Sequence, residues 1–260
     1  MKDKILLFIP GYNCEKQIIR ALGQLDQETI RYFTEIIMVN NRSTDGTEEV
    51  VKRFIEKHPY IPMKLLRNQE NYGLGGSHKV AFAYAKEHGF DYVTVLHGDD
   101  QGTLSDILPV FRKGLHRKHD CILGARFMRG SRLMGYSLFR RFGNVVYDFL
   151  FAAVVKRKIY DLGSGLNVYS VKMLEDSFYE KFPDNLMFNY CMILASQYYA
   201  HDICFYPISW REDDQVSNVK MINQAVTVLK MLYEYWYDAR SIEQDYRDKK
   251  IEEYKAEVIV

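Results

Sequence analysis

The residues His97-Gly98-Asp99-Asp100-Gln101 place two adjacent carboxylates directly after an apolar run that ends at Leu96. Such a pair at the end of a buried strand is unfavourable unless a metal ion, a substrate or a neighbouring arginine neutralises it. A hard cation such as Mg²⁺ prefers oxygen ligands and often keeps substrate phosphates in its shell. We therefore predict that Asp99 and Gln101 hold a divalent cation. Asp100 is expected either to cap the next helix or to touch substrate.

Three other polar clusters follow short apolar runs in the first half of the chain: Pro10-Gly11-Tyr12-Asn13, Asn40-Asn41-Arg42-Ser43 and Arg67-Asn68. The runs at 5–9, 35–39, 63–66 and 92–96 alternate with helical patterns, which indicates a parallel sheet with helices on both faces. Ligands of such sheets bind beyond the carboxyl ends of the strands. All four clusters are therefore expected along one edge, and this convergence is the strongest sign of a binding site.

Amides and glycines supply further candidates at this edge. Asn40 and Asn41 are suited to reading a base, because an amide both donates and accepts hydrogen bonds. Residues 43–47, Ser-Thr-Asp-Gly-Thr, carry capping chemistry for the helix that follows and are mostly structural. The glycines of Asn71-Tyr72-Gly73-Leu74-Gly75-Gly76 precede another helix. They either let backbone N–H groups approach an anion or simply form the turn into that helix.

The region from Arg126 to Lys158 has eight Lys or Arg residues and one acid, Asp148. Its arginines alternate with Phe, Leu, Met and Tyr. This pattern fits anionic lipid headgroups or a phosphate-bearing acceptor, since arginine grips phosphate oxygens in two places at once. An ordinary solvated face is the other interpretation.

The second half of the chain is less regular. Strands are predicted at 122–124, 166–169 and 203–206, and helices at 138–155 and 221–237. The mixed-charge tail from Ser241 to Lys255 is predicted to be a solvated helix.

The overall composition narrows the class of protein. A chain of 260 residues that is 47% hydrophobic suits one large α/β domain or two small ones. A formal charge of +1 argues against a nucleic-acid partner. The four cysteines form no CxxC pair, which makes reduced thiols in a cytosolic setting the simple interpretation. Neither a signal peptide nor a membrane-spanning run is predicted, so the protein is expected in the cytoplasm, where it can still lie on a membrane.

Taken together and in order, several motifs resemble family 2 glycosyltransferases with the GT-A fold, and most of all the polyprenyl-phosphate (dolichol-phosphate) sugar synthases. The motifs are Ile9-Pro10-Gly11-Tyr12-Asn13, Val39-Asn40-Asn41-Arg42-Ser43-Thr44-Asp45-Gly46-Thr47, Asn71-Tyr72-Gly73, His97-Gly98-Asp99-Asp100-Gln101, Gly124-Ala125-Arg126-Phe127 and Asp161-Leu162-Gly163-Ser164-Gly165-Leu166. The resemblance runs from about Ile5 to Ser217. It implies an α/β fold with a Rossmann-like mixed sheet flanked by helices, formed by residues 1–217, and a C-terminal helical extension, residues 218–260.

The resemblance also implies ligands and roles. The donor would be a nucleotide-diphosphate sugar, carried by UDP or GDP, and the cofactor Mg²⁺ or Mn²⁺. Catalytic roles fall to Asp99, Arg126 and Arg132, and the metal ligands would be Asp99, Gln101 and His97. The nucleotide-sugar would meet Pro10, Tyr12, Asn13, Asn40, Asn41, Ser43, Asn71, Gly73, His97, Gly98, Asp99 and Ser164.

The chain departs from the family pattern at two places. Asn40-Asn41 replaces an acidic pair, so the nucleoside site loses negative charge. His97 replaces the first acid of the metal motif, which leaves fewer anionic ligands; a neutral imidazole can instead bond a phosphate or ribose. The residues 183–188, Pro-Asp-Asn-Leu-Met-Phe, also lack the Glu-Asp pair that serves hydroxyl-using relatives as a general base, which favours a phosphate acceptor.

These features predict an inverting glycosyltransferase that moves a sugar to polyprenyl phosphate in cell-surface glycan synthesis. The alternatives are transfer to a glycan hydroxyl in polysaccharide assembly, or a weakened homologue that binds nucleotide sugar. The Q-x-x-R-W signature of processive enzymes is missing. The aromatic residues Tyr233, Tyr235, Trp236 and Tyr237 would meet either the inner face of a membrane, as in a peripheral protein, or the protein itself, through its own core or a twin subunit in a homo-oligomer.

Overall fold

The computed structural model describes residues 2–212 and 221–260. The first half of the chain alternates strands and helices, as its apolar runs predict: β1 (Ile5–Gly11), α1 (Glu15–Leu22), α2 (Gln27–Ile30), β2 (Glu35–Asn40), α3 (Thr47–Lys57), β3 (Met63–Asn68), α4 (Gly73–Glu87) and β4 (Tyr92–Leu96). Each of these strands is buried along most of its length. The four predicted strands of this half are therefore confirmed.

The second half adds shorter elements and two long helices. In chain order these are η1 (Leu104–Asp106), α5 (Leu108–Arg112), η2 (Leu115–Arg117), β5 (Cys121–Ala125), β6 (Arg132–Met134), α6 (Leu138–Val155), β7 (Leu166–Ser170), η3 (Lys172–Leu174), α7 (Phe188–Tyr198), β8 (Ile203–Pro207), β9 (Ser209–Arg211), α8 (Met221–Tyr237), η4 (Ala239–Glu243) and β10 (Ala256–Val258). The helices predicted at 138–155 and 221–237 are confirmed.

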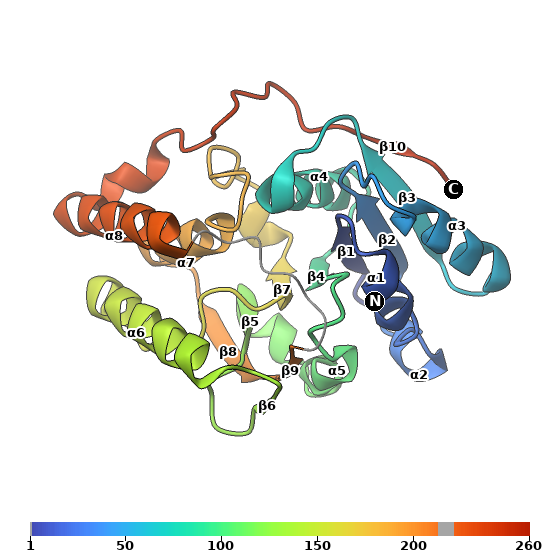
Figure 1. Cartoon of the computed structure of the whole chain (residues 1–260), viewed down its shortest axis with the longest axis horizontal. Coiled ribbons are helices and arrows are strands. Elements are labelled where there is room, and N and C mark those ends of the chain that lie inside the picture. The colour runs from blue at the N-terminus through green and yellow to red at the C-terminus, as the bar shows by residue number, and fades with distance from the viewer. Residues whose placement is uncertain (1, 213–220) are drawn as a thin grey trace.

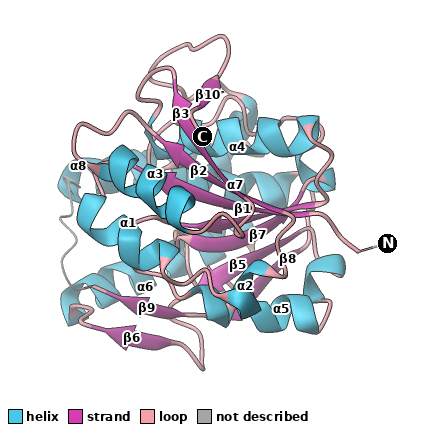
Figure 2. Ribbon diagram, turned by 90° about the vertical axis from the view of Figure 1, so that its right-hand side faces the viewer, coloured by secondary structure: helices cyan, strands magenta, loops and turns pink. Residues whose placement is uncertain are grey.

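Eight strands form one twisted sheet in the order β10-β3-β2-β1-β4-β7-β5-β8 (Figure 2). Strands β3, β2, β1 and β4 run parallel, whereas β7 is antiparallel to β4 and β5, and β10 is antiparallel to β3. The sheet is thus mixed, as the family resemblance implies, and not parallel throughout as the β-α repeats alone would indicate. The separate pair β6–β9 lies beyond one end of the sheet.

Side chains alternate along β1 between two hydrophobic cores, one on each face of the sheet. Leu7 and Ile9 pack with residues of α1, α3 and α5, while Leu6 and Phe8 pack with residues of α4, α6, α7 and α8. In Figure 1, α6 and α8 lie side by side at the end of the molecule away from α3. This arrangement leaves the carboxyl ends of the parallel strands to be covered by loops.

The C-terminal tail is not the solvated helix predicted for 241–255. After η4 it runs in an extended path across the top of the molecule in Figure 1 and adds β10 to the edge of the sheet beside β3. Tyr254 packs on the ring of Tyr72 and bonds Asp184, and Arg67 pairs with Glu257. These tertiary contacts outweigh the local preference of a charged sequence for helix.

The predicted boundary between domains at 217 and 218 lies outside the described residues. No helix in the described part of the chain is long and apolar enough to cross a membrane.

Candidate active site

The site candidates gather where the order of the strands reverses. β2 lies on one side of β1 and β4 on the other, and ligands of such sheets bind outside the strand ends beside this reversal. We call the region outside the carboxyl ends of β1, β2 and β4 the crevice. The Gly98 N–H donates to the Pro10 carbonyl over 3.0 Å, which joins the two loops at the base of this crevice. Tyr12, 48% exposed, lies beside it with Asn13. The predicted convergence of polar residues is confirmed for these two strands.

The loops after β1 and β2 are held together by hydrogen bonds that backbone N–H groups donate, some of them to the carboxylates of Glu15 and Asp45. Asn13 Oδ1 accepts from the Thr44 N–H at 2.8 Å, and the Asn13 N–H donates to Ser43 Oγ at 3.0 Å. Deeper down, the Cys14 N–H donates to Thr47 Oγ1 at 2.9 Å. Residues 12–15 and 40–47 therefore form one rigid surface, which we call the amide side of the crevice.

The two asparagines predicted to read a base use their amides within the protein. Asn40 is buried and donates to Glu48 Oε2 at 2.8 Å, while its Oδ1 accepts from the Ser43 N–H at 2.9 Å. Asn41 is also buried; its Oδ1 accepts from Asn68 and from the Tyr72 N–H. Both side chains thus shape the loops of the amide side.

The glycines before α4 favour the interpretation of a tight turn. Gly73 has φ +69°, and a Cβ there would lie 2.3 Å from the Asp184 carbonyl oxygen. The Gly75 N–H donates to that same carbonyl at 2.7 Å, and the Gly73 N–H donates to Asn71 Oδ1 at 3.0 Å. Asn71 Oδ1 also accepts from Asn41 at 2.8 Å. Close packing and capping, rather than an anion, explain these residue types.

The adjacent acids Asp99 and Asp100 have different surroundings. Asp100 is 1% exposed, has φ +61°, and forms ion pairs with Arg20, at 2.7 Å, and with Arg211. Gln24 also donates to it. Neighbouring arginines therefore neutralise Asp100, and its role is structural. It does not cap the helix that follows.

Asp99 has the electrostatics of a functional acid. Burial raises its pKa to about 6, against the Gln101 N–H that donates to Oδ1 and the more distant charge of Arg126, which lower it. A carboxyl poised near neutral pH at the end of a central strand is common at functional sites. Asp99 remains the first candidate for the donor diphosphate and its cation.

His97 packs flat on Gly165. The backbone N–H of His97 donates to the Gly165 carbonyl at 2.9 Å, and a Cβ on Gly165 would lie 2.4 Å from the imidazole Cγ. Burial, with a smaller contribution from Arg126, lowers the His97 pKa to about 4, so the imidazole is neutral at physiological pH. Its Nε2 is buried and has no partner among the described residues. The ring lies nearly perpendicular to that of His78, with 6.2 Å between centroids.

Gln101 points toward β9. Its amide donates to the Arg211 carbonyl at 3.3 Å, and the Arg211 N–H donates back to the Gln101 carbonyl at 3.0 Å. Gly102 bridges to Trp210 in the same strand. Within residues 2–212 and 221–260, no three or more His, Cys, Asp or Glu side chains gather as a preformed cation cage. A donor set of one carboxylate nevertheless fits Mg²⁺ or Mn²⁺ where substrate phosphates supply the other oxygens.

Arg126 and Arg132, both predicted to be catalytic, are placed very differently. Arg126 is held by Asp161 through two bonds of 2.7 Å to its guanidinium, and its own N–H donates to the same carboxylate. Asp161 raises the pKa of Arg126, although burial alone would lower it. Arg132 lies exposed in β6 and forms no ion pair with a described residue. Arg132 is therefore the more accessible cation.

Ser164, predicted to meet the nucleotide sugar, lies in the loop before β7. Its hydroxyl is buried and lies within hydrogen-bond distance of Asn167 Oδ1, at 3.3 Å, and of the Leu166 carbonyl. Both contacts lie within the turn that carries Gly165.

Sequence reasoning missed the partners of these charges. Asp161 belongs to the motif of residues 161–166, but the sequence indicated no role for it. Arg20, Gln24 and Arg211 belong to no motif. Arg20 lies in the last turn of α1, and Gln24 lies in the turn just after its end, four residues on. That spacing was the one sequence signal for Arg20 and Gln24. No sequence signal pointed to Arg211, because its contacts depend on where β9 lies.

Asp148 is a second acid with a raised pKa. It projects from the inner face of α6, is 6% exposed, and burial together with the charge of Asp161 raises its pKa to about 8, while Arg126 lowers it. Its carboxyl is therefore protonated at neutral pH. The residues 97–102, 126, 132, 148 and 161 form what we call the charged side of the crevice.

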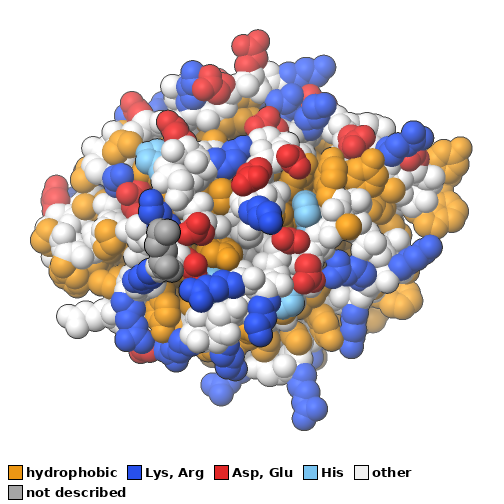
Figure 3. Space-filling view, turned by 180° about the vertical axis from the view of Figure 1, so that it is seen from behind, with side chains coloured by type: hydrophobic (Ala, Val, Ile, Leu, Met, Phe, Trp, Pro, Cys, Tyr) orange, Lys and Arg blue, Asp and Glu red, His pale blue; other side chains and the backbone are white. Residues whose placement is uncertain are grey.

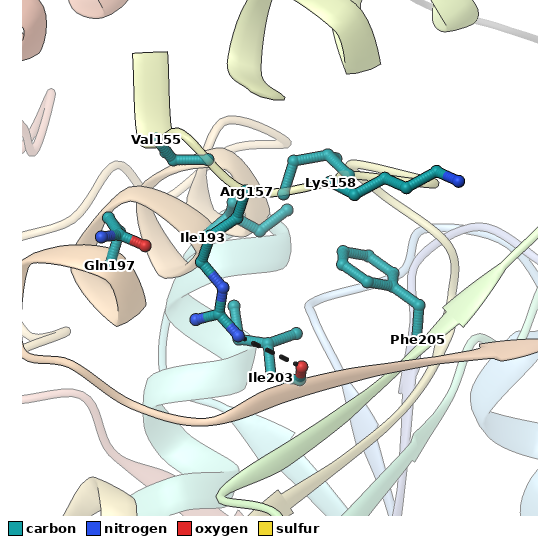
Figure 4. Close-up of a pocket in the computed structure, with 8 residues that line it drawn as sticks. Val155, Arg157, Lys158, Ile193, Gln197, Ile203 and Phe205 are labelled. Atoms are coloured by element: carbon teal, nitrogen blue, oxygen red, sulfur yellow. Dashed lines mark hydrogen bonds between the residues drawn. The ribbon is translucent and has the colours of Figure 1, made fainter. Parts of the chain in front are cut away.

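A separate cavity of about 30 Å³ opens between the end of α6, α7 and β8 (Figure 4). Its walls are mainly apolar, and Arg157 reaches across it to the carbonyls of His201 and Ile203. Lys158 points away from it in Figure 4. The cavity is too small for a nucleotide sugar and is unrelated to the strand ends.

Comparison with known proteins identifies the family. The family model of Glycosyl transferase family 2 matches residues 7–178. The chain belongs to glycosyl transferase family 2. Its matched region contains the loops after β1, β2 and β4, Arg126 and Asp161, so the crevice described above lies within the family domain.

Two of the relatives have names that include dolichyl phosphate. A UDP-N-acetylglucosamine–dolichyl-phosphate N-acetylglucosaminyltransferase of Methanococcus voltae is 24% identical over 67% of this chain and 73% of the relative. A dolichyl-phosphate beta-glucosyltransferase of Trichomonas vaginalis is 22% identical over 86% of this chain and 69% of the relative. An uncharacterized protein of Methanocaldococcus jannaschii is 28% identical, and the match spans 65% of each chain.

Solved structures confirm the GT-A fold. Glucosyl-3-phosphoglycerate synthase from Mycobacterium tuberculosis, in complex with Mn²⁺, UDP-glucose and phosphoglyceric acid, superposes with a TM-score of 0.63 at 15% identity. That match covers 90% of this chain and 80% of the synthase. The Staphylococcus aureus TarS fragment 1–349 with UDP-GlcNAc gives a TM-score of 0.56 at 15% identity, over 92% of this chain and 74% of the fragment.

Proposed function

We propose that the protein transfers a sugar from a UDP- or GDP-linked donor to the phosphate of a polyprenyl phosphate, as one step of cell-surface glycan synthesis. The relatives that use dolichyl phosphate match most of the chain, and structural neighbours are solved with UDP sugars. The observation that carries the choice of acceptor is the state of Asp184.

Asp184 is the only carboxylate in residues 183–188. By the family resemblance, this is the stretch in which hydroxyl-using relatives carry the Glu-Asp pair that supplies their general base. It pairs with Lys79 at 2.7 Å and accepts from the Tyr254 hydroxyl at 2.7 Å. Lys79 is 2% exposed, so removing Asp184 from this pair would leave a buried charge. A hydroxyl acceptor needs a general base, whereas an ionised phosphate needs none. Because Lys79 and Tyr254 hold Asp184, it is poorly placed to act as a general base, which favours a phosphate as the acceptor.

The donor would lie in the crevice, with its nucleoside along the amide side and its diphosphate toward Asp99. Tyr12 is exposed there and the loops that flank it are fixed by hydrogen bonds. Mg²⁺ or Mn²⁺, when bound, would neutralise the diphosphate as it leaves. Asp99 is the side chain that would hold it, and His97 offers a neutral imidazole beside it.

In the transfer itself, an oxygen of the acceptor phosphate attacks the anomeric carbon of the donor sugar. The bond from that carbon to the diphosphate breaks, the nucleoside diphosphate leaves, and the configuration inverts. Arg132 is the accessible cation for the acceptor phosphate. Arg126 contributes a fixed positive charge, because Asp161 holds its guanidinium in one orientation.

A glycan hydroxyl is the second candidate acceptor, and Asp148 is the observation that favours it. Its pKa of about 8 lies near the operating pH, so the minor ionised fraction of the carboxyl can take a proton and that fraction grows as the pH rises. It lies on the charged side, close enough for Arg126 and Asp161 to affect its pKa. Under this alternative, Asp148 would be the base.

An acceptor competition assay separates these functions. The protein is incubated with labelled UDP and GDP sugars, Mn²⁺ and either polyprenyl phosphate or a sugar acceptor. Label that enters the organic phase supports the proposal. Label on the sugar acceptor, lost in Asp148→Asn, supports the alternative. Nucleotide-sugar binding without turnover on either acceptor overturns both and indicates a homologue that only binds.

A further inference from the structure

Helix α6 carries an apolar stripe on its outer face. Its inner face packs on the core through Phe151 and Val155, with Asp148 buried between them and the site. The outer stripe repeats at helical spacing and is exposed by 40 to 79%: Leu138, Phe142, Val145, Val146 and Phe149. A helix that is apolar on both faces normally has a partner on each. The structure of this chain supplies a partner for the inner face.

Helix α8 shows the same arrangement. Met231, Leu232 and Tyr235 are buried in the core, which settles Tyr235 as a packing residue. The residues that point outward are 48 to 80% exposed: Val226, Leu229, Tyr233, Trp236 and Tyr237. The expected interface aromatics therefore divide, with three of the four on the outside. Trp and Tyr with one apolar and one polar end are favoured where a bilayer meets water.

The two outer stripes form one surface at the same end of the molecule. α6 contacts α8, and both lie at the left of Figure 1. Seen from behind in Figure 3, hydrophobic side chains and Lys or Arg side chains occupy the corresponding right-hand end together. We call this the α6–α8 surface.

The charge around this surface has one sign at α6. Arg141, Lys156 and Lys158 are exposed on or just after the helix, and its single acid, Asp148, is buried on the opposite side. On α8, Lys230 is 75% exposed and pairs with Glu234, so the basic excess of the surface comes from α6. Basic side chains beside an apolar helix face are the pattern of helices that lie in the headgroup region of anionic bilayers.

We propose that the α6–α8 surface docks on a bilayer that contains anionic lipids, with the two apolar stripes inserted and the basic side chains among the headgroups. The inference deepens the proposed function, since it says where the lipid-linked acceptor arrives. The inner face of α6 already borders the site, because Asp148 lies within the electrostatic reach of Arg126 and Asp161. Docking through the outer face would bring an acceptor phosphate to the same helix.

A second copy of the chain is the competing occupant. In a twofold contact the same patch meets itself. The basic rim of α6 would then face its own copy, which like-charge repulsion opposes. An anionic bilayer complements both the apolar stripes and the rim.

The test is vesicle co-sedimentation of the full chain. Wild type is compared with Phe142→Gln/Phe149→Gln, which removes two exposed rings from the stripe. The matched control is Tyr60→Gln, because Tyr60 is 61% exposed and lies after α3, away from the α6–α8 surface. Vesicles of phosphatidylcholine with and without phosphatidylglycerol separate the apolar and the electrostatic contributions.

We expect wild type to bind the phosphatidylglycerol vesicles and to release on raising the salt concentration. The double variant should bind them about tenfold or more weakly, because each lost ring removes apolar area from the bilayer. Tyr60→Gln should bind as wild type does. Equal binding by wild type and the double variant, no binding by wild type, or a dimer that the double variant dissociates without any vesicle binding would each overturn the proposal.

Turnover distinguishes this inference from the proposed function. With a short, water-soluble polyprenyl phosphate, the double variant should keep the wild-type rate, because neither ring lies in the site. Vesicle binding without sugar transfer by any variant would defeat the proposed function and leave the docking surface intact.

Discussion

The two sides of the crevice are built by different means. The amide side is joined by hydrogen bonds from neutral donors, such as those of Asn13 with Thr44 and of Asn40 with Ser43, although Glu15 and Asp45 accept some of them. The charged side contains buried acids paired with arginines, as in Asp100 with Arg20 and Asp161 with Arg126. Bonds from neutral donors give a fixed shape for a nucleoside at little electrostatic cost. Charge is concentrated where a diphosphate must be held and released.

Within the charged side, the acids themselves fall into two groups. Asp100 and Asp161 are matched to arginines and fix the loops around the site. Asp99 and Asp148 have pKa values that burial raises toward neutral pH. The first group is expected to matter mainly for stability, and the second for chemistry or for its pH dependence. The following predictions test that division.

The adjacent acids should give the largest contrast. Asp99→Asn should lower sugar transfer by about 100-fold or more, since it removes the carboxylate nearest the leaving diphosphate, while the thermal midpoint is unchanged or slightly higher. Asp100→Asn leaves Arg20 and Arg211 without their acid and should destabilise the fold by about 3 kcal/mol. Calorimetry and steady-state rates on both variants measure the contrast. Similar losses of activity and stability in the two would contradict it.

The two arginines predicted from sequence to be catalytic should separate next. Arg126→Gln leaves buried Asp161 unpaired and should lower the free energy of unfolding by about 3–5 kcal/mol. Arg132→Gln should leave the melting curve unchanged and raise the KM for the acceptor several-fold, with little change in the KM for the donor. If Arg132→Gln affected only the donor, Arg132 would belong to the diphosphate and not to the acceptor.

Two glycines of one loop provide a smaller and cleaner contrast. A Cβ on Gly165 would lie 2.4 Å from the His97 ring, whereas a Cβ on Gly163 would meet its nearest atom, in Tyr190, at 3.9 Å. Gly165→Ala should therefore displace His97 and lower transfer by about tenfold or more, and Gly163→Ala should behave as wild type. Nucleotide-sugar titrations would show whether the loss lies in donor binding. A normal rate in Gly165→Ala would exclude a role for the His97 position.

The last prediction is a pH dependence of stability. The Asp148 pKa is about 8 in the folded protein and near 4 when unfolded. Between these values the folded state binds more protons, so the free energy of unfolding falls as pH rises. Asp148→Asn removes this loss, and its thermal midpoint should rise relative to wild type by about 10 °C from pH 5 to pH 8, then level off. If the difference in thermal midpoint between the variant and wild type stayed constant across this range, Asp148 would be solvent-exposed with an ordinary pKa.

The sequence predicts the strands and most helices because each apolar run or stripe has one dominant period. Leu138–Val155 shows this well, since its buried residues Asp148, Phe151 and Val155 repeat at helical spacing. The tail failed for the opposite reason: its fate depends on Tyr254 and Glu257, which bond residues about 70 to 190 positions away. Local preference carries no information on such contacts.

The site shows the same limit. Motifs place Asp99, His97 and Arg126 at the right strand ends, because strand ends converge in any sheet of this kind. They cannot show that Asn40 and Asn41 bond inward, or that Asp161 holds Arg126, since those contacts form only when loops from distant segments meet. Nor can they show that Arg20 and Arg211 pair with Asp100, since those contacts also join distant segments.

The most direct test of the account is the bond that the protein forms. A short-chain polyprenyl phosphate is incubated with the donor sugar nucleotide that supports turnover, with Mn²⁺, and the product is examined by ³¹P NMR. We predict that the phosphomonoester signal is replaced by that of a sugar phosphodiester with inverted anomeric configuration, and that Asp99→Asn yields none of it. A phosphomonoester that stays unchanged while the same protein glycosylates a sugar hydroxyl would contradict the account.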